Sequence, residues 1–303
     1  MISLAIIIPY FKIDYFEETL QSIENQSDKR FHVYIGDDNS PDTPELIIEK
    51  NLKTTKYSYI KFPQNLGGKD LTKQWHRCIN LSSQEEWIMI LGDDDVLEKD
   101  VVSQFYNNLH KISENNIEVI RYSTKTINKD SIVTSIFRLK SNLIQSKASF
   151  IDKLLKKERS SLSEHIFSRK SFEKNHFKNF PIAFGSDDVA WLEFSNFSNL
   201  LGIKDCYVLI RDSEINLSST PDKKIGRERV KGIFAYNKYI LQRHAHHFNL
   251  KQKLIIAAKA YNRLRHSNRK NYIQLLVFSL LLFKKVGIKN TFKIYLNNKN
   301  YQY

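Results

Sequence analysis

The sequence predicts an α/β fold: a mixed, mostly parallel sheet flanked by helices, with a basic helical extension at the C-terminus. Three observations support this prediction. Short apolar segments alternate with segments of helical periodicity over residues 1–110, which is typical of βαβ units. The 303 residues, 41% of them hydrophobic, can form one large α/β domain of roughly 200–250 residues and an appendage. Positive charge is concentrated after residue 220.

The first four strands are separated by three helices. The apolar residues 3–8 form a buried strand that Pro9 ends, and the next helix, 15–26, places Phe16, Leu20 and Ile23 on one face. The later elements are strands at 31–36, 57–62 and 87–91, helices at 43–53 and 71–81, and a loop at 65–68. Thr43 or Asp42 is the expected N-cap of the second helix.

After about residue 115 the periodicity is weaker. Strands are expected at 118–123, 132–138, 163–167 and 207–210, and helices at 150–157 and after the acidic residues of segment 184–197. From about residue 225 the chain is predicted to be helical. We therefore expect a domain over 1–220, with halves at 1–110 and 111–220, and a separate helical region over 221–303.

The charge is very unevenly distributed. Residues 221–303 contain 19 lysines and arginines against two acids, Asp222 and Glu228, whereas residues 1–220 contain 28 against 31. Such a region suits an anionic surface of lipid or nucleic acid, or it is a solvated helical face without a partner. The two cysteines, the lack of a signal-peptide pattern and the lack of ~18–20 consecutive apolar residues predict a cytoplasmic protein.

Polar or acidic turns follow three of the four N-terminal strands, at residues 9–11, 37–38 and 92–95. If the strands are parallel, these turns meet at one edge of the sheet, where α/β folds bind ligands. Three consecutive aspartates, Asp93, Asp94 and Asp95, repel one another, and a divalent cation such as Mn²⁺ or Mg²⁺ would relieve that repulsion. Alternatively the segment is a solvated turn, with Asp95 capping a helix at 96–109.

A second acidic cluster consists of Gly185, Ser186, Asp187 and Asp188. A carboxylate close to an acceptor hydroxyl can act as a general base. The alternative is a helix N-terminus, with Ser186 as the cap and the aspartates favoured by the helix dipole.

In the basic region, residues 272–283 are almost continuously apolar and too short, at ~18 Å as a helix, to span a bilayer. Basic residues lie on both sides of this segment, within 263–285: Arg263, Arg265, Arg269, Lys270, Lys284 and Lys285. The segment either enters one leaflet of an anionic membrane or packs on the rest of the protein, including at a homodimer contact. It contains no nucleic-acid recognition motif, so no nucleic acid is expected as a partner.

Five segments in order resemble the inverting family 2 glycosyltransferases of GT-A fold: IIIPYF, GDDNSPD, NLGGKDLTKQW, WIMILGDDDVL and GSDDVAW. The resemblance covers roughly residues 1–215. It implies a nucleotide-sugar-binding half over 1–110 and an acceptor half over 111–220. Members of this kind commonly build bacterial surface polysaccharides or lipid-linked glycans.

The resemblance also implies roles for residues of the first half. Pro9, Tyr10 and Phe11 match the strand end beside the base and ribose of the donor, with Phe11 as a candidate stacking ring. Asp38 matches the acid that binds the nucleobase, and Asp37 lies beside it.

Two further matches in the first half concern the donor diphosphate and the metal. Lys69 corresponds to a basic residue near the diphosphate. Asp93, Asp94 and Asp95 correspond to the metal and ribose motif, although Gly92 stands where that motif usually has its first acid.

In the second half, Asp188, or else Asp187, corresponds to the catalytic base, and Trp191 is a candidate for the acceptor cleft or else a core residue. The predicted activity is metal-dependent, inverting transfer of one hexosyl or N-acetylhexosaminyl group, with a UDP-sugar as the expected donor. The acceptor is a glycan or a lipid-linked hydroxyl, and the reaction takes place in the cytoplasm or on the inner face of its membrane. Two alternatives are a nucleic-acid-binding protein that uses the basic tail, and a nucleotidyltransferase.

Overall fold

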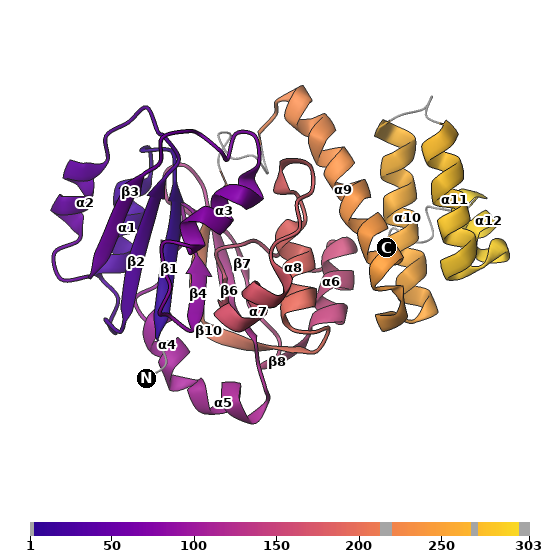
Figure 1. Cartoon of the computed structure of the whole chain (residues 1–303). Coiled ribbons are helices and arrows are strands. Elements are labelled where there is room, and N and C mark those ends of the chain that lie inside the picture. Colours follow the sequence, from indigo (N-terminus) through magenta and orange to yellow (C-terminus); the bar gives the residue numbers. More distant parts are fainter. Residues whose placement is uncertain (1–2, 213–219, 268–271, 297–303) are drawn as a thin grey trace.

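The computed structural model describes residues 3–212, 220–267 and 272–296 (Figure 1). The strands are β1 Leu4–Tyr10, β2 Phe31–Asp37, β3 Tyr57–Lys61, β4 Trp87–Ile90, β5 Val96–Leu97, β6 Val119–Ile127, β7 Val133–Phe137, β8 Leu143–Gln145, β9 His165–Ser168 and β10 Asn199–Arg211. The helices are α1 Phe16–Glu24, α2 Glu45–Asn51, α3 Leu71–Ile79, α4 Val101–Asn107, α5 Leu109–Glu114, α6 Ser146–Leu154, α7 Arg169–Asn175, α8 Ser186–Phe194, α9 Lys223–Arg243, α10 Leu250–Ser267, α11 Tyr272–Val286 and α12 Ile288–Leu296. Short 3₁₀ helices lie at η1 Pro181–Ala183 and η2 Ala245–His247.

One sheet connects all ten strands, in the order β3-β2-β1-β4-β9-β6-β10-β5, with β7 beside β6 and β8 beside β10. Strands β3, β2, β1 and β4 pair in parallel, and β10 pairs in parallel with β6. Because β9 is antiparallel to both β4 and β6, six of the eight strands in that order run in one direction. The predicted mixed, mostly parallel sheet flanked by helices is therefore confirmed.

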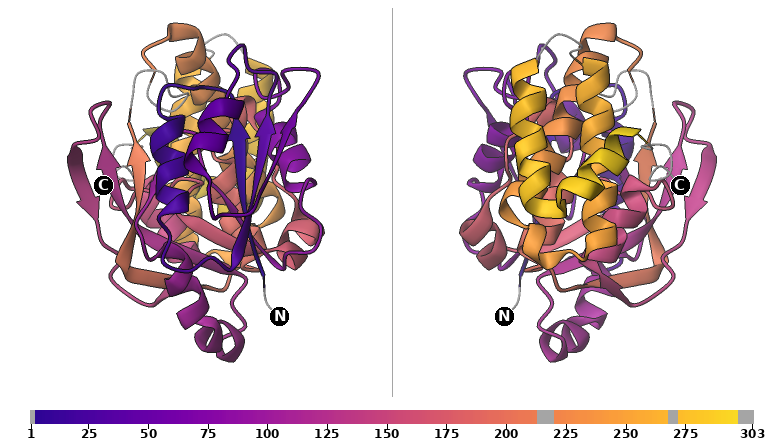
Figure 2. Two further views of the ribbon diagram at one scale, coloured as in Figure 1. Left: turned by 90° about the vertical axis from the view of Figure 1, so that its left-hand side faces the viewer. Right: turned by 90° about the vertical axis from the view of Figure 1, so that its right-hand side faces the viewer.

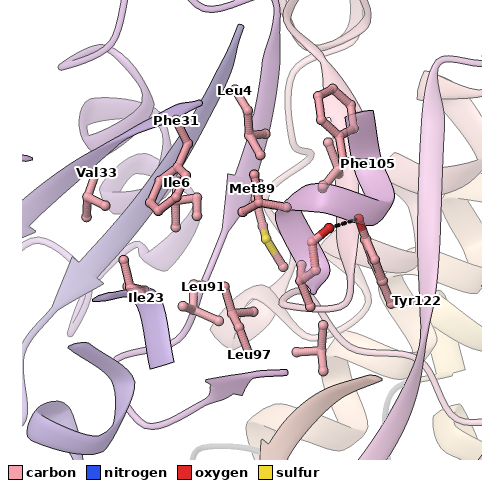
Figure 3. Close-up of a cluster of buried hydrophobic side chains, with 14 of the residues drawn as sticks. Leu4, Ile6, Ile23, Phe31, Val33, Met89, Leu91, Leu97, Phe105 and Tyr122 are labelled. Atoms are coloured by element: carbon pink, nitrogen blue, oxygen red, sulfur yellow. Dashed lines mark hydrogen bonds between the residues drawn. The ribbon is translucent and has the colours of Figure 1, made fainter. Parts of the chain in front are cut away.

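The strand β1 lies between two apolar cores, which explains why residues 3–8 are continuously apolar. Leu4, Ile6 and Ile8 point into a core that α1 and α4 complete (Figure 3). Ala5 and Ile7 point into a second core, to which α3, α7 and α8 contribute. In the first core the hydroxyl of Tyr122 donates a hydrogen bond to a backbone carbonyl of α4, 2.8 Å away.

Three helix caps differ from the prediction. Helix α2 begins at Glu45 after Pro44, so neither Thr43 nor Asp42 caps it. Asp95 caps no helix, because the residues after it pair with β10 as the short strand β5 and α4 begins only at Val101.

Helix α8 has a glycine as its cap. Gly185 is the N-cap, with φ +84°, and Ser186 is the first residue of the helix. The left-handed backbone favours glycine here, and a Cβ would lie 2.3 Å from the ring of Tyr236. Ser186 Oγ is buried without a hydrogen-bond partner among the described residues.

Two elements of the second half also differ in their bounds. Helix α6 begins at Ser146 and ends at Leu154, four residues earlier at its start than the predicted helix 150–157. Strand β10 is 13 residues long, much longer than the predicted strand 207–210. Its length comes from its partner β6, with which it pairs from Leu201 to Arg211 across a register shift after Ile203.

The C-terminal helices α9 to α12 pack at one end of the molecule, on the side away from β1, β2 and β3 (Figures 1 and 2). They share an apolar core with α6 and α8, to which Phe150, Leu154, Val189 and Leu192 contribute. The helical prediction for this region is confirmed over its described part. Within the described residues, no helix is both long and apolar enough to cross a membrane.

Candidate active site

The three polar turns meet at the carboxyl edge of the parallel strands, as predicted. The register places Tyr10 beside Asp37, and Ile7 beside Ile90 at the end of β4. The turn after β4 then reaches back to β1: Asp93 Oδ2 accepts hydrogen bonds from the backbone N–H groups of Phe11 and Lys12, both at 2.8 Å. One carboxylate thus ties the ends of two neighbouring strands together.

Of the three consecutive aspartates, Asp95 is the buried one. Its Oδ1 accepts a hydrogen bond from the N–H of Arg211 at 2.9 Å. Its Oδ2 accepts a hydrogen bond from the hydroxyl of Ser163, which itself accepts one from the N–H of Gly92. Both oxygens of Asp95 therefore hold the turn against β10 and the segment before β9.

The buried side chain of Arg211 supports the same turn. Its Nε donates a hydrogen bond to the backbone carbonyl of Asp94 at 3.0 Å, and its Nη2 pairs with Glu18 at 2.8 Å. Its Nη1 donates to the carbonyl of Asn128 and to the hydroxyl of Ser131. The aspartate turn is consequently fixed by its backbone and by Asp95.

The side chains of Asp93 and Asp94 are half-buried at the edge of the sheet. Burial and the neighbouring Asp94 carboxylate raise the pKa of Asp93 to about 6. Burial is also the main cause of a raised pKa at Asp95. Burial and mutual repulsion make the charged form of these carboxylates unfavourable, and a bound cation would remove that cost.

Gly92, in the position of the usual first acid, leaves little room for a side chain. A Cβ there would lie 2.9 Å from Asp95 Oδ2 and 3.1 Å from Asp94 Oδ1. A fourth acidic side chain would therefore crowd two carboxylates that are already close together.

Asp37 and Asp38, at the end of β2, are both buried and bind neighbouring loops. Asp37 accepts hydrogen bonds from Ser40 N–H and the hydroxyl of Tyr59, each at 2.7 Å. Asp38 accepts hydrogen bonds from the backbone N–H groups of residues 66 and 67, at 2.6 and 2.8 Å, and pairs with Arg77. Asp38 thus shapes the loop 65–68 beside the edge of the sheet.

The remaining candidates for donor binding differ in their exposure. Phe11 is 39% exposed, and Pro9 is half-buried. Tyr10 is fully buried, and its ring packs on Phe16 with the ring centroids 4.5 Å apart. Lys69 is exposed on the loop after β3. Phe11 is therefore the aromatic ring of this set that a ligand can reach.

The second acidic cluster lies at the N-terminus of α8. Asp188 is buried and forms an ion pair with Lys153 of α6. Asp187 is half-buried, and burial together with the Asp188 carboxylate raises its pKa to about 7. Lys153 opposes this rise, since a nearby cation favours the charged carboxylate.

Asp188 and Lys153 line a small pocket of about 290 Å³ of space between atoms. Trp191 lies on its wall and stacks on His165, with the ring centroids 4.1 Å apart. Trp191 is only 5% exposed, and its Nε1 has no hydrogen-bond partner among the described residues. The tryptophan thus belongs mainly to the aromatic core under this pocket.

Among the described residues, no three His, Cys, Asp or Glu side chains form a ready-made metal site. The donor set still fits Mg²⁺ or Mn²⁺, because such ions are commonly held by one or two carboxylates together with substrate phosphates. Asp93 and Asp94 provide half-buried carboxylates at the edge of the sheet.

Four supporting residues were missed by sequence reasoning: Ser163, Arg211, Lys153 and Arg77. Each contacts a predicted aspartate that is distant in sequence; Ser163 and Arg211, for instance, are 68 and 116 residues from Asp95. No local pattern in the sequence marks such pairs.

The chain matches the family model "Glycosyl transferase family 2" over residues 5–201, and it therefore belongs to this family. It is a nucleotide-sugar glycosyltransferase with a GT-A-like fold. None of the curated proteins compared with it matches.

Solved structures show the same fold at low sequence identity. Staphylococcus aureus TarS 1-349 is 16% identical, with a TM-score of 0.62 over 99% of this chain and 83% of that one. Its complex with UDP-GlcNAc is 17% identical, with a TM-score of 0.63 over 100% and 93%. The mannosyltransferase PcManGT from Pyrobaculum calidifontis, in complex with GDP-Man and Mn²⁺, is 12% identical, with a TM-score of 0.52 over 98% and 86%.

Proposed function

We propose that this glycosyltransferase moves one sugar per encounter from a UDP-sugar to a hydroxyl of a glycan or lipid-linked acceptor, with inversion and with the help of Mn²⁺ or Mg²⁺. One observation carries the proposal. The aspartate turn lies at the carboxyl edge of the parallel strands and is tied to β1 through Asp93 and to β10 through Asp95. A rigid acidic turn at this edge suits a nucleoside diphosphate and its cation.

The residues divide the donor-binding work as follows. Asp94, with the second oxygen of Asp93, would hold the metal, while Asp95 and Arg211 keep the turn in place. Phe11 would offer its exposed ring to the base, and Asp38 lies at the same edge of the sheet. The metal, when bound, would neutralise the leaving diphosphate.

The acceptor half would supply the base. The pair Asp187 and Asp188 lies at the N-terminus of α8, and the raised pKa of Asp187 is close to neutral, where a general base is most effective. Removing the proton of the acceptor hydroxyl prepares it for attack on the anomeric carbon from the side opposite the diphosphate. One such displacement inverts the configuration at that carbon.

The chemistry is tested by screening nucleotide sugars for hydrolysis and transfer, with Mn²⁺, with Mg²⁺ and with a chelator. We expect UDP-sugars to be consumed only when metal is present, and Asp94→Asn to lower that rate. Lys99→Gln, which replaces an exposed lysine two residues before α4, serves as the control. Full activity of wild type and Asp94→Asn in chelator would contradict the metal site.

We also propose that the reaction takes place in the cytoplasm or on the inner face of its membrane, which the basic charge of the C-terminal region supports. Synthesis of a bacterial surface polysaccharide fits such an acceptor. Transfer assays with free and lipid-linked oligosaccharides distinguish the two acceptor classes.

A further inference from the structure

Helix α11 has two apolar faces, of which one is buried. Phe278, Leu282 and Val286 recur every four residues and are buried in the core shared with α9, α10 and α12. The ring of Phe278 packs on Phe234 of α9, with the centroids 5.4 Å apart. This face explains half of the apolar segment 272–283 as ordinary packing.

The opposite face of α11 is exposed. Ile273, Leu276 and Leu280 are 76%, 62% and 57% exposed, and Val277 lies between them on the same side of the helix. Burial on the protein would give one apolar stripe, so a second, exposed stripe needs another explanation.

Helix α12 extends this exposed surface. Its residues Ile288, Phe292 and Leu296 are all more than half exposed. The ring of Phe292 lies 6.4 Å from that of Phe283 in α11, so the two helices adjoin there. We call these seven exposed residues the outer apolar face: Ile273, Leu276, Val277, Leu280, Ile288, Phe292 and Leu296. Both helices lie at the end of the molecule farthest from β3 (Figures 1 and 2).

The surroundings of the outer apolar face are basic. Lys284, Lys289 and Lys293 are exposed on the same two helices, and Lys285 is half-buried. No aspartate or glutamate follows Glu228 in the sequence, and residues 221–303 carry a net charge of +17. Arg269 and Lys270 lie outside the described residues.

This charge decides between the possible occupants. A second copy of the chain would bring its own lysines against these, and like charges disfavour that contact. An anionic lipid surface offers both phosphate headgroups for the lysines and an apolar layer for the side chains. We propose that the outer apolar face docks on an anionic membrane, with α11 and α12 lying in the interface.

Helix α11 packs on α9, and α9 in turn contacts the acceptor half. Tyr236 of α9 lies directly against Gly185, the first residue of the second acidic cluster. The hydroxyl of Tyr239 in α9 donates a hydrogen bond to Glu193 of α8 at 2.6 Å. His244, at the end of α9, pairs with the same carboxylate at 2.8 Å. Docking would therefore fix the orientation of the acceptor half relative to the lipid surface.

The test is co-sedimentation of the full chain with vesicles of phosphatidylcholine alone or mixed with phosphatidylglycerol, at low and high salt. We expect binding only to the vesicles that contain phosphatidylglycerol, and weaker binding at high salt. The double variant Leu276→Glu, Leu280→Glu should lose it. Lys284→Gln and Lys289→Gln should each weaken it by about fivefold.

Two controls match these variants. Leu46→Glu changes a leucine of α2 that is 78% exposed at the other end of the molecule, and Lys99→Gln removes an exposed lysine between β5 and α4. Both should bind vesicles like the wild type, and thermal unfolding should show that every variant is folded.

Three results would overturn the proposal. These are no binding to phosphatidylglycerol vesicles at low salt, equal binding by wild type and the double glutamate variant, or a dimer that the double variant converts to monomer while vesicles are not bound. The assay needs no sugar transfer, so its failure would leave the proposed enzyme activity untouched.

Discussion

The guanidinium of Arg211 holds the backbone of Asp94, because its Nε donates a hydrogen bond to the Asp94 carbonyl at 3.0 Å. The aspartate that we assign to the metal is thus positioned through its main chain. The N–H of Arg211 meanwhile binds Asp95. Strand β10, 13 residues long, brings this arginine to the edge of the sheet.

Arg211→Lys should therefore weaken both the fold and the site. A lysine cannot reproduce the fork that reaches Glu18, Asn128 and Asp94, so buried acceptors lose their donors. We expect a loss of about 2–3 kcal/mol in the free energy of unfolding, measured with urea, and slower transfer. Arg138→Lys, which changes an exposed pair with Asp205, should cost about 0.5 kcal/mol or less.

Asp94→Asn should mainly lower the activity, whereas Asp95→Asn should mainly lower the stability. Asp94→Asn should lower metal-dependent transfer by about 100-fold or more, with the smaller change in stability. Asp95→Asn should lower the free energy of unfolding by about 1–3 kcal/mol, because one of its two bonded oxygens becomes an amide group facing a donor. Urea unfolding and Mn²⁺ titration of the rate measure the two effects, and equal effects of both variants would refute this division.

The acid limb of the pH–rate profile should follow Asp187 and its partner. A general base acts when deprotonated, so kcat/KM should fall as the pH drops below about 7, the raised pKa of Asp187. A limb near pH 4, the ordinary range of an aspartate, would show that another group limits the rate.

The same raised pKa makes a prediction for stability. A carboxyl with a higher pKa in the folded than in the unfolded state binds its proton more tightly when folded, so its contribution to stability declines as the pH rises toward the folded value. Asp187→Asn removes this decline. The variant should gain stability over wild type, and more so at about pH 8 than at about pH 4, while it loses transfer activity. Thermal unfolding at the two pH values measures this.

Lys153→Met should move the acid limb of the profile to higher pH. Lys153 lowers the pKa of Asp187 and pairs with Asp188, so its loss leaves two neighbouring carboxylates without their cation. A shift of about one unit or more is expected. Lys156→Met, at an exposed position just after α6, should leave the profile unchanged, and an unshifted limb in Lys153→Met would exclude this electrostatic role.

The fold and the meeting of the polar turns could be predicted from the sequence because both follow from local patterns. The period of the apolar residues identifies β1 to β4, and parallel strands place their carboxyl ends at one edge. The caps could not be predicted. Asp95 resembles an N-cap locally, but the partners of its carboxylate, Ser163 and Arg211, come from distant segments.

The same limit applies to the second acidic cluster. The sequence identified Asp187 and Asp188, but not the contact with Lys153, which lies 35 residues from Asp188. Likewise the segment 272–283 gave two alternatives, packing or lipid, whereas the helix has one buried and one exposed apolar face. A stretch that is apolar all round does not reveal how much of its surface the protein covers.

The occupied carboxylate oxygens of the aspartate turn also predict a coupling between metal and nucleotide. Both oxygens of Asp95 and one of Asp93 already accept hydrogen bonds from the protein. The protein alone would therefore offer a cation few ligands, and the diphosphate of the donor would supply others. Metal and nucleotide should then each raise the affinity for the other by the same factor, which calorimetry of each ligand with and without its companion would measure.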